Sequence, residues 1–164
     1  MTRLHDETIS LSERSAKAQQ CDNVQALVTI HTNSAKSSQT QGIETFCHQP
    51  HLFRTMLYKG DHSFKPVIGS VYNDIDVKSY QFARAVHTNI LKYAQRGNRA
   101  VVDRKIKHQV SQLLLNSTAP SILVELGFLT HPQEKVLLQQ DSYQMLLAQG
   151  IVEGIEEFFR SSFV

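Results

Sequence analysis

The amino-acid sequence predicts a single α/β domain with a central, mostly parallel sheet flanked by helices. Three short runs have the composition of strands: ALVTI at residues 26–30, GIETFC at 42–47 and SILVE at 121–125. Helical patterns lie between these runs, and strands that alternate with helices are typical of parallel sheets. No internal repeat or linker divides the chain, so we expect one domain over residues 1–164.

The N-terminal part is expected to form one helix and two strands. Residues 10–13 (SLSE) match a capping box, which predicts a helix that runs to about Gln20. The apolar run 26–30 suits a strand that is buried on both faces, and the polar stretch 32–41 is predicted to be a loop. Residues 42–47 alternate in side-chain type with a period of two, as a second strand would.

The middle of the chain combines an irregular segment with two predicted helices. Residues 48–73 lose all periodicity, and an irregular stretch of this length is usually a functional loop or a mobile one. Asp76 is expected to cap a helix that ends at Gly97, because apolar side chains recur on one face. These apolar residues are Tyr80, Ala83, Val86, Ile90 and Ala94. A further helix is predicted over residues 105–116.

The C-terminal part is expected to contain the third strand and two more helices. Residues 121–125 have the clearest strand pattern in the chain. Pro132 is predicted to begin a short helix, with Thr130 or His131 as its cap. Asp141 is expected to cap a last helix with one apolar face.

The composition excludes several classes of protein. The formal net charge is +2 and the basic residues are scattered, which argues against nucleic acid as a partner. No apolar run reaches the roughly 18 residues of a membrane span, and residues 1–10 carry charge where a signal peptide has its apolar core. Cys21 and Cys47 are expected to be free thiols, with Cys47 packed beside a strand.

Two residues that follow apolar strands are candidates for chemistry. His31 comes directly after the run 26–30, and Glu125 ends the run 121–125. The carboxyl ends of parallel strands share one edge, where open α/β folds bind ligands. There the two side chains could form a metal site with a general base, or a proton-transfer pair. Alternatively, His31 is a turn residue and Glu125 pairs with an arginine such as Arg99.

The other histidines give weaker patterns. His48 and His51 follow Cys47 with a spacing that could place two imidazoles on one metal ion. Pro50, between the two histidines, interrupts the helical geometry that such a site would need. The remaining candidates have no partner pattern and are expected at solvated positions: His62, His87 and His108.

Five segments, in order along the chain, resemble the zinc-dependent N-acetylmuramoyl-L-alanine amidases of bacterial cell-wall turnover and division. The segments are TRLHD with LSER (2–14), TIHTNS (29–34), GIETF (42–46), Asn98–Arg99 and APSILVELGFLTHPQE (119–134). The last is the most specific of them. Their common order makes the resemblance strong, although each short segment alone would be weak.

The resemblance implies a mixed sheet flanked by helices, one zinc ion per intact domain, and peptidoglycan as the substrate. The expected reaction is hydrolysis of the amide between N-acetylmuramic acid and L-alanine of the stem peptide. By position, His31 would be a zinc ligand and Glu125 the general base and acid. The substrate-binding residues would be Asn33, Glu44 and Arg99.

The sequence also departs from the family pattern. Family members hold zinc with a His-Glu-His set, and its first two ligands lie in an opening strand and helix that have no counterpart in residues 1–164. Three explanations stay open: the ligands are encoded upstream of Met1; the chain is an inactive remnant that only binds peptidoglycan or a regulatory partner; or His48, His51 or His62 complete a rearranged site. At position 131 the chain carries a histidine where the family usually has asparagine. This His131 is expected to cap a helix.

The segment 48–75 occupies the place of a family insertion that blocks the site in division-linked members until a partner protein displaces it. The resemblance therefore implies that this segment borders the substrate groove and that an activator protein could act on it. A passive surface loop is the alternative reading. The family further implies a periplasmic or otherwise extracytoplasmic location.

Overall fold

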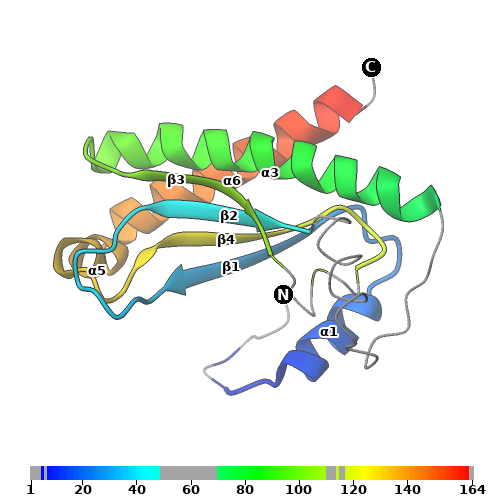
Figure 1. Ribbon diagram of the computed structural model, residues 1–164, viewed down its shortest axis with the longest axis horizontal. Coiled ribbons are helices and arrows are strands. Elements are labelled where there is room, and N and C mark those ends of the chain that lie inside the picture. The colour runs from blue at the N-terminus through cyan, green and yellow to red at the C-terminus, as the bar shows by residue number, and fades with distance from the viewer. Residues whose placement is uncertain (1–4, 6, 49–69, 110–113, 115–116, 163–164) are drawn as a thin grey trace, which may run out of the picture.

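A computed structural model describes the chain over residues 5, 7–48, 70–109, 114 and 117–162 (Figure 1). In chain order the elements are α1 (Leu11–Gln19), β1 (Leu27–Asn33), β2 (Ile43–Cys47), α3 (Ser70–Gly97), β3 (Asp103–His108), β4 (Ser121–Phe128), α5 (Pro132–Leu138) and α6 (Asp141–Ser162). None of the helices described is long and apolar enough to cross a membrane.

The four strands form one mixed sheet in the order β1-β4-β2-β3. β1 runs parallel to β4 and β2 runs parallel to β3, whereas β4 and β2 are antiparallel. The prediction of an α/β domain with a central sheet and flanking helices is confirmed, and two of the three strand pairings are parallel.

The structure overturns the prediction that residues 26–30 are buried on both faces. Within the described chain, β1 pairs only with β4 and therefore lies at an edge of the sheet. Ile30 is 59% exposed as a result. An apolar run of this length fits a central strand equally well, so the sequence pattern could not distinguish the two positions.

The hydrophobic core lies between one face of the sheet and the helices α3 and α6. Figure 1 shows these two helices together along one side of the sheet. The side chains of β2 that alternate toward them are fully buried, as are two from β4: Ile43, Thr45, Cys47, Ile122 and Val124. The period-two prediction for β2 is thereby confirmed.

Helices α3 and α6 cross at unusually short range because two glycines of α6 face the backbone of α3. A Cβ atom added at Gly154 would lie 2.4 Å from the Cα atom of Val86, and one at Gly150 would lie 2.7 Å from the Cα atom of Ile90. The spacing of four residues places both glycines on one face of α6. Only residues without a side chain allow this approach.

Three expected helix features were wrong and two are confirmed. The predicted helix over 105–116 is wrong for residues 105–108, which belong to β3 (Asp103–His108), whereas Leu114 is helical. The overlap with β3 comprises four residues of mixed polarity, which do not distinguish a helix from a strand. The pairing of β3 with β2 decides the outcome. Asp76 does not cap α3, which begins at Ser70, and Asp141 lies within α6 rather than before it. The capping box of α1 and the His131 cap of α5 are both present.

A buried carboxylate joins the end of β4 to the start of β2. Glu134 of α5 is 6% exposed and accepts hydrogen bonds from the backbone N–H groups of Phe128 (2.7 Å) and Gly42 (2.9 Å). Gly127, with a φ of +140°, passes so close that a Cβ atom there would lie 3.3 Å from Glu134 Oε2. Glu134 therefore fixes the end of the sheet at which β4 terminates.

Replacing Glu134 by glutamine is expected to lower the free energy of unfolding by about 1.5–3 kcal/mol. A glutamine keeps one acceptor oxygen but turns an NH₂ group toward a backbone N–H donor, which leaves that donor buried and unpaired. Urea denaturation measures the change, with the same substitution at the exposed residue Glu156 as the control. Equal midpoints for the two variants would contradict this role for Glu134.

Candidate active site

Three titratable side chains form a row across the sheet. His31 of β1 is the register partner of Glu125 on β4, and Glu125 is also the register partner of Glu44 on β2. Register partners project from the same face of a sheet. The core beneath α3 and α6 contains Ile43, Thr45 and Val124, the sequence neighbours of Glu44 and Glu125, so the row lies on the opposite face. The expected meeting of His31 and Glu125 at one edge of the sheet is confirmed as a placement.

Glu125 is set up to hold or release a proton near neutral pH. Its Oε2 atom is buried and has no hydrogen-bond partner among the residues described. Burial raises the pKa of the Glu125 carboxyl to about 7, and the charge of Glu44 contributes in the same direction. A carboxyl group with such a pKa can act both as a general base and as a general acid.

Glu44 has the opposite behaviour because donors surround it. Asn33 Nδ2 donates to Glu44 Oε1 at 2.7 Å, Arg104 Nε donates to Oε2 at 2.8 Å, and Lys107 Nζ also donates to Oε2. Burial by itself would raise the pKa of Glu44, but the hydrogen bonds from Lys107 and Arg104 outweigh it and lower the pKa. Two neighbouring carboxyl groups thus have pKa values shifted in opposite directions, which separates their roles.

His31 offers a neutral imidazole at the exposed side of the row. Its side chain reaches the surface, yet nearby chain atoms remove enough water to lower its pKa, and the charge of Arg14 on α1 adds to the effect. A neutral imidazole has a lone pair that can bind a metal ion. Among the residues described, however, no group of three or more His, Cys, Asp or Glu side chains is arranged to hold one. A catalytic zinc ion needs about three protein ligands, so these residues alone do not fit it.

The other residues singled out from the sequence are more scattered. Arg99 is exposed in the turn between α3 and β3, at the end of the sheet where β4 terminates. His48 is buried against Asp76, with His48 Nδ1 at 3.0 Å from Asp76 Oδ1, and follows the opposite end of β2. His51 and His62 lie outside the described residues, as does most of the segment 48–75.

His87 differs from the solvated position expected for it, whereas His108 is exposed as expected. His87 is 6% exposed, with its Nδ1 atom 2.9 Å from Thr45 Oγ1 and its Nε2 atom 2.9 Å from Asp103 Oδ1. This expectation was wrong because both partners come from strands distant in sequence. His108 is exposed, but on a strand, with Nδ1 at 3.6 Å from Cys47 Sγ.

The free-thiol prediction is confirmed for both cysteines. Cys21 is exposed and Cys47 is buried, and neither forms a disulfide. Burial, with the charge of Asp76, raises the pKa of the Cys47 thiol to about 11. Cys47 is therefore a packing residue rather than a nucleophile at neutral pH.

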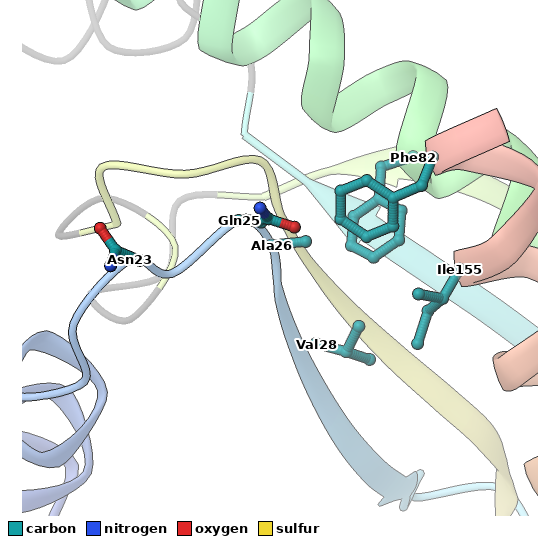
Figure 2. Close-up of a pocket in the computed structure, with 7 residues that line it drawn as sticks. Asn23, Gln25, Ala26, Val28, Phe82 and Ile155 are labelled. Carbon is teal, nitrogen blue, oxygen red and sulfur yellow. The ribbon is translucent and has the colours of Figure 1, made fainter. Parts of the chain in front are cut away.

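A hollow of about 320 Å³ lies on the other face of the sheet and is unsuited to hydrolysis. Figure 2 shows its lining, which comes from the segment before β1 and from β1, α3 and α6. The main contributors are the apolar side chains of Val28, Phe82, Ile155 and Phe159. None of these can transfer a proton or polarise a carbonyl group. The row around Glu125 is consequently the better candidate for chemistry.

Sequence reasoning missed Arg104 and Lys107, which hold Glu44 beside Glu125. Both lie in the segment predicted to be helical or to precede a helix, where they would be ordinary exposed charges. Recognising β3 as a strand beside β2 would have been needed to find them.

The match to a family profile decides the relationship. The profile of N-acetylmuramoyl-L-alanine amidases matches residues 1–157. The chain belongs to this amidase family. One curated relative, named "Probable cell wall amidase LytH" from Staphylococcus epidermidis, is 24% identical over 161 residues. The alignment covers 98% of this chain but only 42% of the relative, so the chain spans less than half of that protein.

Solved amidase structures share the fold. An N-acetylmuramoyl-L-alanine amidase from Clostridium difficile 630 is 30% identical with a TM-score of 0.71, and the match covers 97% of this chain and 70% of that one. The CwlD amidase from Clostridioides difficile, solved in complex with the GerS lipoprotein, is 21% identical with a TM-score of 0.65, covering 92% of this chain and 62% of that one. The row of His31, Glu125 and Glu44 is thus carried by an amidase fold.

Proposed function

We propose that this chain carries the general base of a peptidoglycan amidase, which cleaves the amide between N-acetylmuramic acid and L-alanine of the stem peptide. The proposal covers residues 1–164 as an amidase catalytic domain without the N-terminal zinc-ligand segment. The proposal rests on the environment of the Glu125 side chain. A half-buried carboxyl whose Oε2 atom is buried and whose pKa is about 7, in a chain of the amidase family, suits proton transfer during amide hydrolysis.

In the proposed reaction, the Glu125 carboxylate takes a proton from the water that attacks the scissile carbonyl group. The same carboxyl then donates this proton to the departing amine of L-alanine, so the side chain ends in its starting state. Ionised Glu44 on the neighbouring strand helps to keep Glu125 basic. Asn33, Glu44 and Arg99 are the proposed substrate-binding residues, and Asn33 Nδ2 also holds Glu44 in place.

Zinc enters the proposal through His31 alone. The family is generally zinc-dependent, and a bound zinc ion would polarise the carbonyl group and acidify the water. His31 is the proposed ligand from the described residues, and they contain no complete ligand set. Further ligands must therefore come from outside the described residues. Elemental analysis of the purified chain tests this. A tightly held zinc ion that is bound by described residues alone would contradict it.

Replacing Glu125 by glutamine is expected to slow release of stem peptide from purified sacculi by roughly 10²–10⁴-fold, because the proton acceptor is lost. Zinc content is expected to stay unchanged, since Glu125 is not a proposed ligand. Glu156→Gln, an exposed change of the same kind, is the control. Undiminished release by the Glu125 variant would contradict the assigned role.

A second candidate function is peptidoglycan binding without hydrolysis. The single imidazole in the row around Glu125 favours it, because the described residues provide too few zinc ligands. This candidate predicts saturable binding to sacculi, no bound metal and no release of stem peptide when zinc is supplied. Release of stem peptide by the wild-type chain would exclude it.

We further propose an extracytoplasmic location and a protein partner that acts near residues 48–75. The location follows the curated relative named as a probable cell wall amidase. The partner is suggested by the CwlD amidase, which was solved with the GerS lipoprotein. In this segment the structure describes His48 and the start of α3 from Ser70.

A further inference from the structure

We propose that Arg104 and Lys107 form a subsite that binds a carboxylate of the substrate, beside Glu125 on the open face of the sheet. The inference rests on the peptidoglycan function proposed above and names a chemical group that the chain recognises. It depends on the backbone geometry of β3, on the unused donors of Arg104 and on the charge balance around Glu44.

A β-bulge brings the two cations to the same side of β3. Ile43 pairs with Asp103 and Thr45 pairs with Ile106, so one residue of β2 opposes two residues of β3. Lys105, within the bulge, has a φ of +71°, a conformation that lysine rarely adopts. Without the bulge, side chains three positions apart would project from opposite faces. With it, Arg104 and Lys107 both reach Glu44 Oε2.

A chain of hydrogen bonds that runs from the surface into the core holds the bulge in place. Asp103 Oδ1 accepts from the backbone N–H of Lys105 at 2.8 Å and lies 2.9 Å from His87 Nε2. His87 Nδ1 in turn lies 2.9 Å from Thr45 Oγ1, in the core of β2. The strained conformation is thus supported from β2 and α3 together. Bulges that re-aim side chains are frequent next to active sites.

Arg104 keeps most of its donors available. Its Nε atom donates to Glu44, and its guanidinium carbon lies 5.0 Å from the centre of the Phe128 ring. The two terminal nitrogens make no hydrogen bond to any residue that the structure describes. Held by Glu44 on one side and Phe128 on the other, the guanidinium presents a fixed edge with paired N–H donors. Such an edge matches a carboxylate in bidentate geometry.

Within the ion pairs of Glu44, the positive charges outnumber the negative charge by one. Glu44 carries one negative charge and pairs with two cations. The Glu44 side chain is 5% exposed, whereas those of Arg104 and Lys107 are 30% and 40% exposed, so an anion can approach the cations from solvent. Glu44 is the register partner of Glu125, and such partners have Cβ atoms roughly 5 Å apart. A carboxylate bound here would therefore belong to the part of the stem peptide next to the amide bond at which Glu125 transfers protons.

Two soluble probes that differ in one group test the subsite: N-acetylmuramoyl-L-alanyl-D-glutamate, and N-acetylmuramoyl-L-alanyl-D-isoglutamine, in which one carboxylate is an amide. Their affinities for the 164-residue chain are measured by calorimetric or NMR titration at low salt. We expect the acid to bind roughly 10-fold more tightly than the amide. Arg104→Gln should reduce this ratio to about one. The control Lys105→Asn removes a charge from the same strand, suits the positive φ and should preserve the ratio.

Equal affinities of the wild-type chain for the two probes, or undetectable binding of both, would overturn the subsite. So would a ratio that survives in a folded Arg104→Gln variant. Because the wild-type comparison changes only the ligand, it does not depend on how the variant folds. The hydrolytic function fails separately: acid-selective binding without release of stem peptide would keep the subsite and reject the amidase activity, and release at equal rates from both probes would do the reverse.

Discussion

Glu125→Gln is expected to stabilise the fold at pH 8 and to leave its stability unchanged at pH 4. The pKa of the carboxyl is about 7 in the folded chain, raised from an ordinary value of 4.5. The folded state therefore holds a proton that the unfolded state has already lost between these two pH values. The contribution of Glu125 to wild-type stability is lost as the pH rises from 4.5 through 7, and the neutral glutamine does not experience this loss. The full shift corresponds to roughly 3 kcal/mol, which solvent at the open face reduces to about 1–2 kcal/mol.

Urea unfolding of both proteins at pH 4, 6 and 8 measures the effect, since the difference between them cancels the titration of all other groups. Glu156→Gln serves as the control, because its exposed carboxyl should give a difference that does not change with pH. A stability difference for Glu125→Gln that is the same at pH 4 and pH 8 would show that the carboxyl is not buried unfavourably. Together with the expected loss of hydrolysis, the predicted gain would mean that the site is maintained at the expense of stability.

Gly154→Ala is expected to lower the free energy of unfolding by about 2 kcal/mol or more, although alanine favours helices. At an exposed helical position the same change would stabilise by about 1 kcal/mol. Here the new Cβ atom would lie 2.4 Å from Val86 Cα and 2.9 Å from Ala85 O. Both are backbone atoms, so the clash is relieved only when α3 and α6 move apart and lose packing along their whole contact.

Urea denaturation again provides the measurement. Gln149→Ala, at an exposed position of the same helix, is the matched control and should change stability by less than about 0.5 kcal/mol. Gly154→Leu should be more severe than Gly154→Ala, because the added atoms extend further into α3. If Gly154→Ala instead stabilised the chain, the close crossing of the two helices would be wrong.

How much of the site was predictable depends on where the partners of each residue lie. His31 and Glu125 each end an apolar run, so their placement at one end of the sheet follows from local pattern and parallel pairing. Their direct register does not, because β4 is last in sequence yet lies between β1 and β2. The burial of Glu44 and of His87 depends on contacts with β3, and the sequence of β3 resembles that of a helix.

The helices were predictable to a similar degree. The capping box of α1 and the His131 cap of α5 involve residues three positions apart, so local sequence determines them. The start of α3 could not be placed from Asp76, because that carboxyl is buried against His48 instead of capping the helix. The role of Glu134 also required the fold, since one of its two donors, Gly42, is distant in sequence.

The edge position of β1 has a mechanical consequence for the site. Leu27 N donates to Pro120 O, so with the period of a strand the amide of Thr29 also points toward β4, whereas those of Val28 and Ile30 point away from the sheet. β4, in contrast, is paired along both sides. Local opening begins where backbone pairing is one-sided. Among the described residues, Glu125 therefore lies on a strand that is paired on both sides and His31 on a strand that is paired on one side, so we expect local opening to displace the imidazole before the carboxylate.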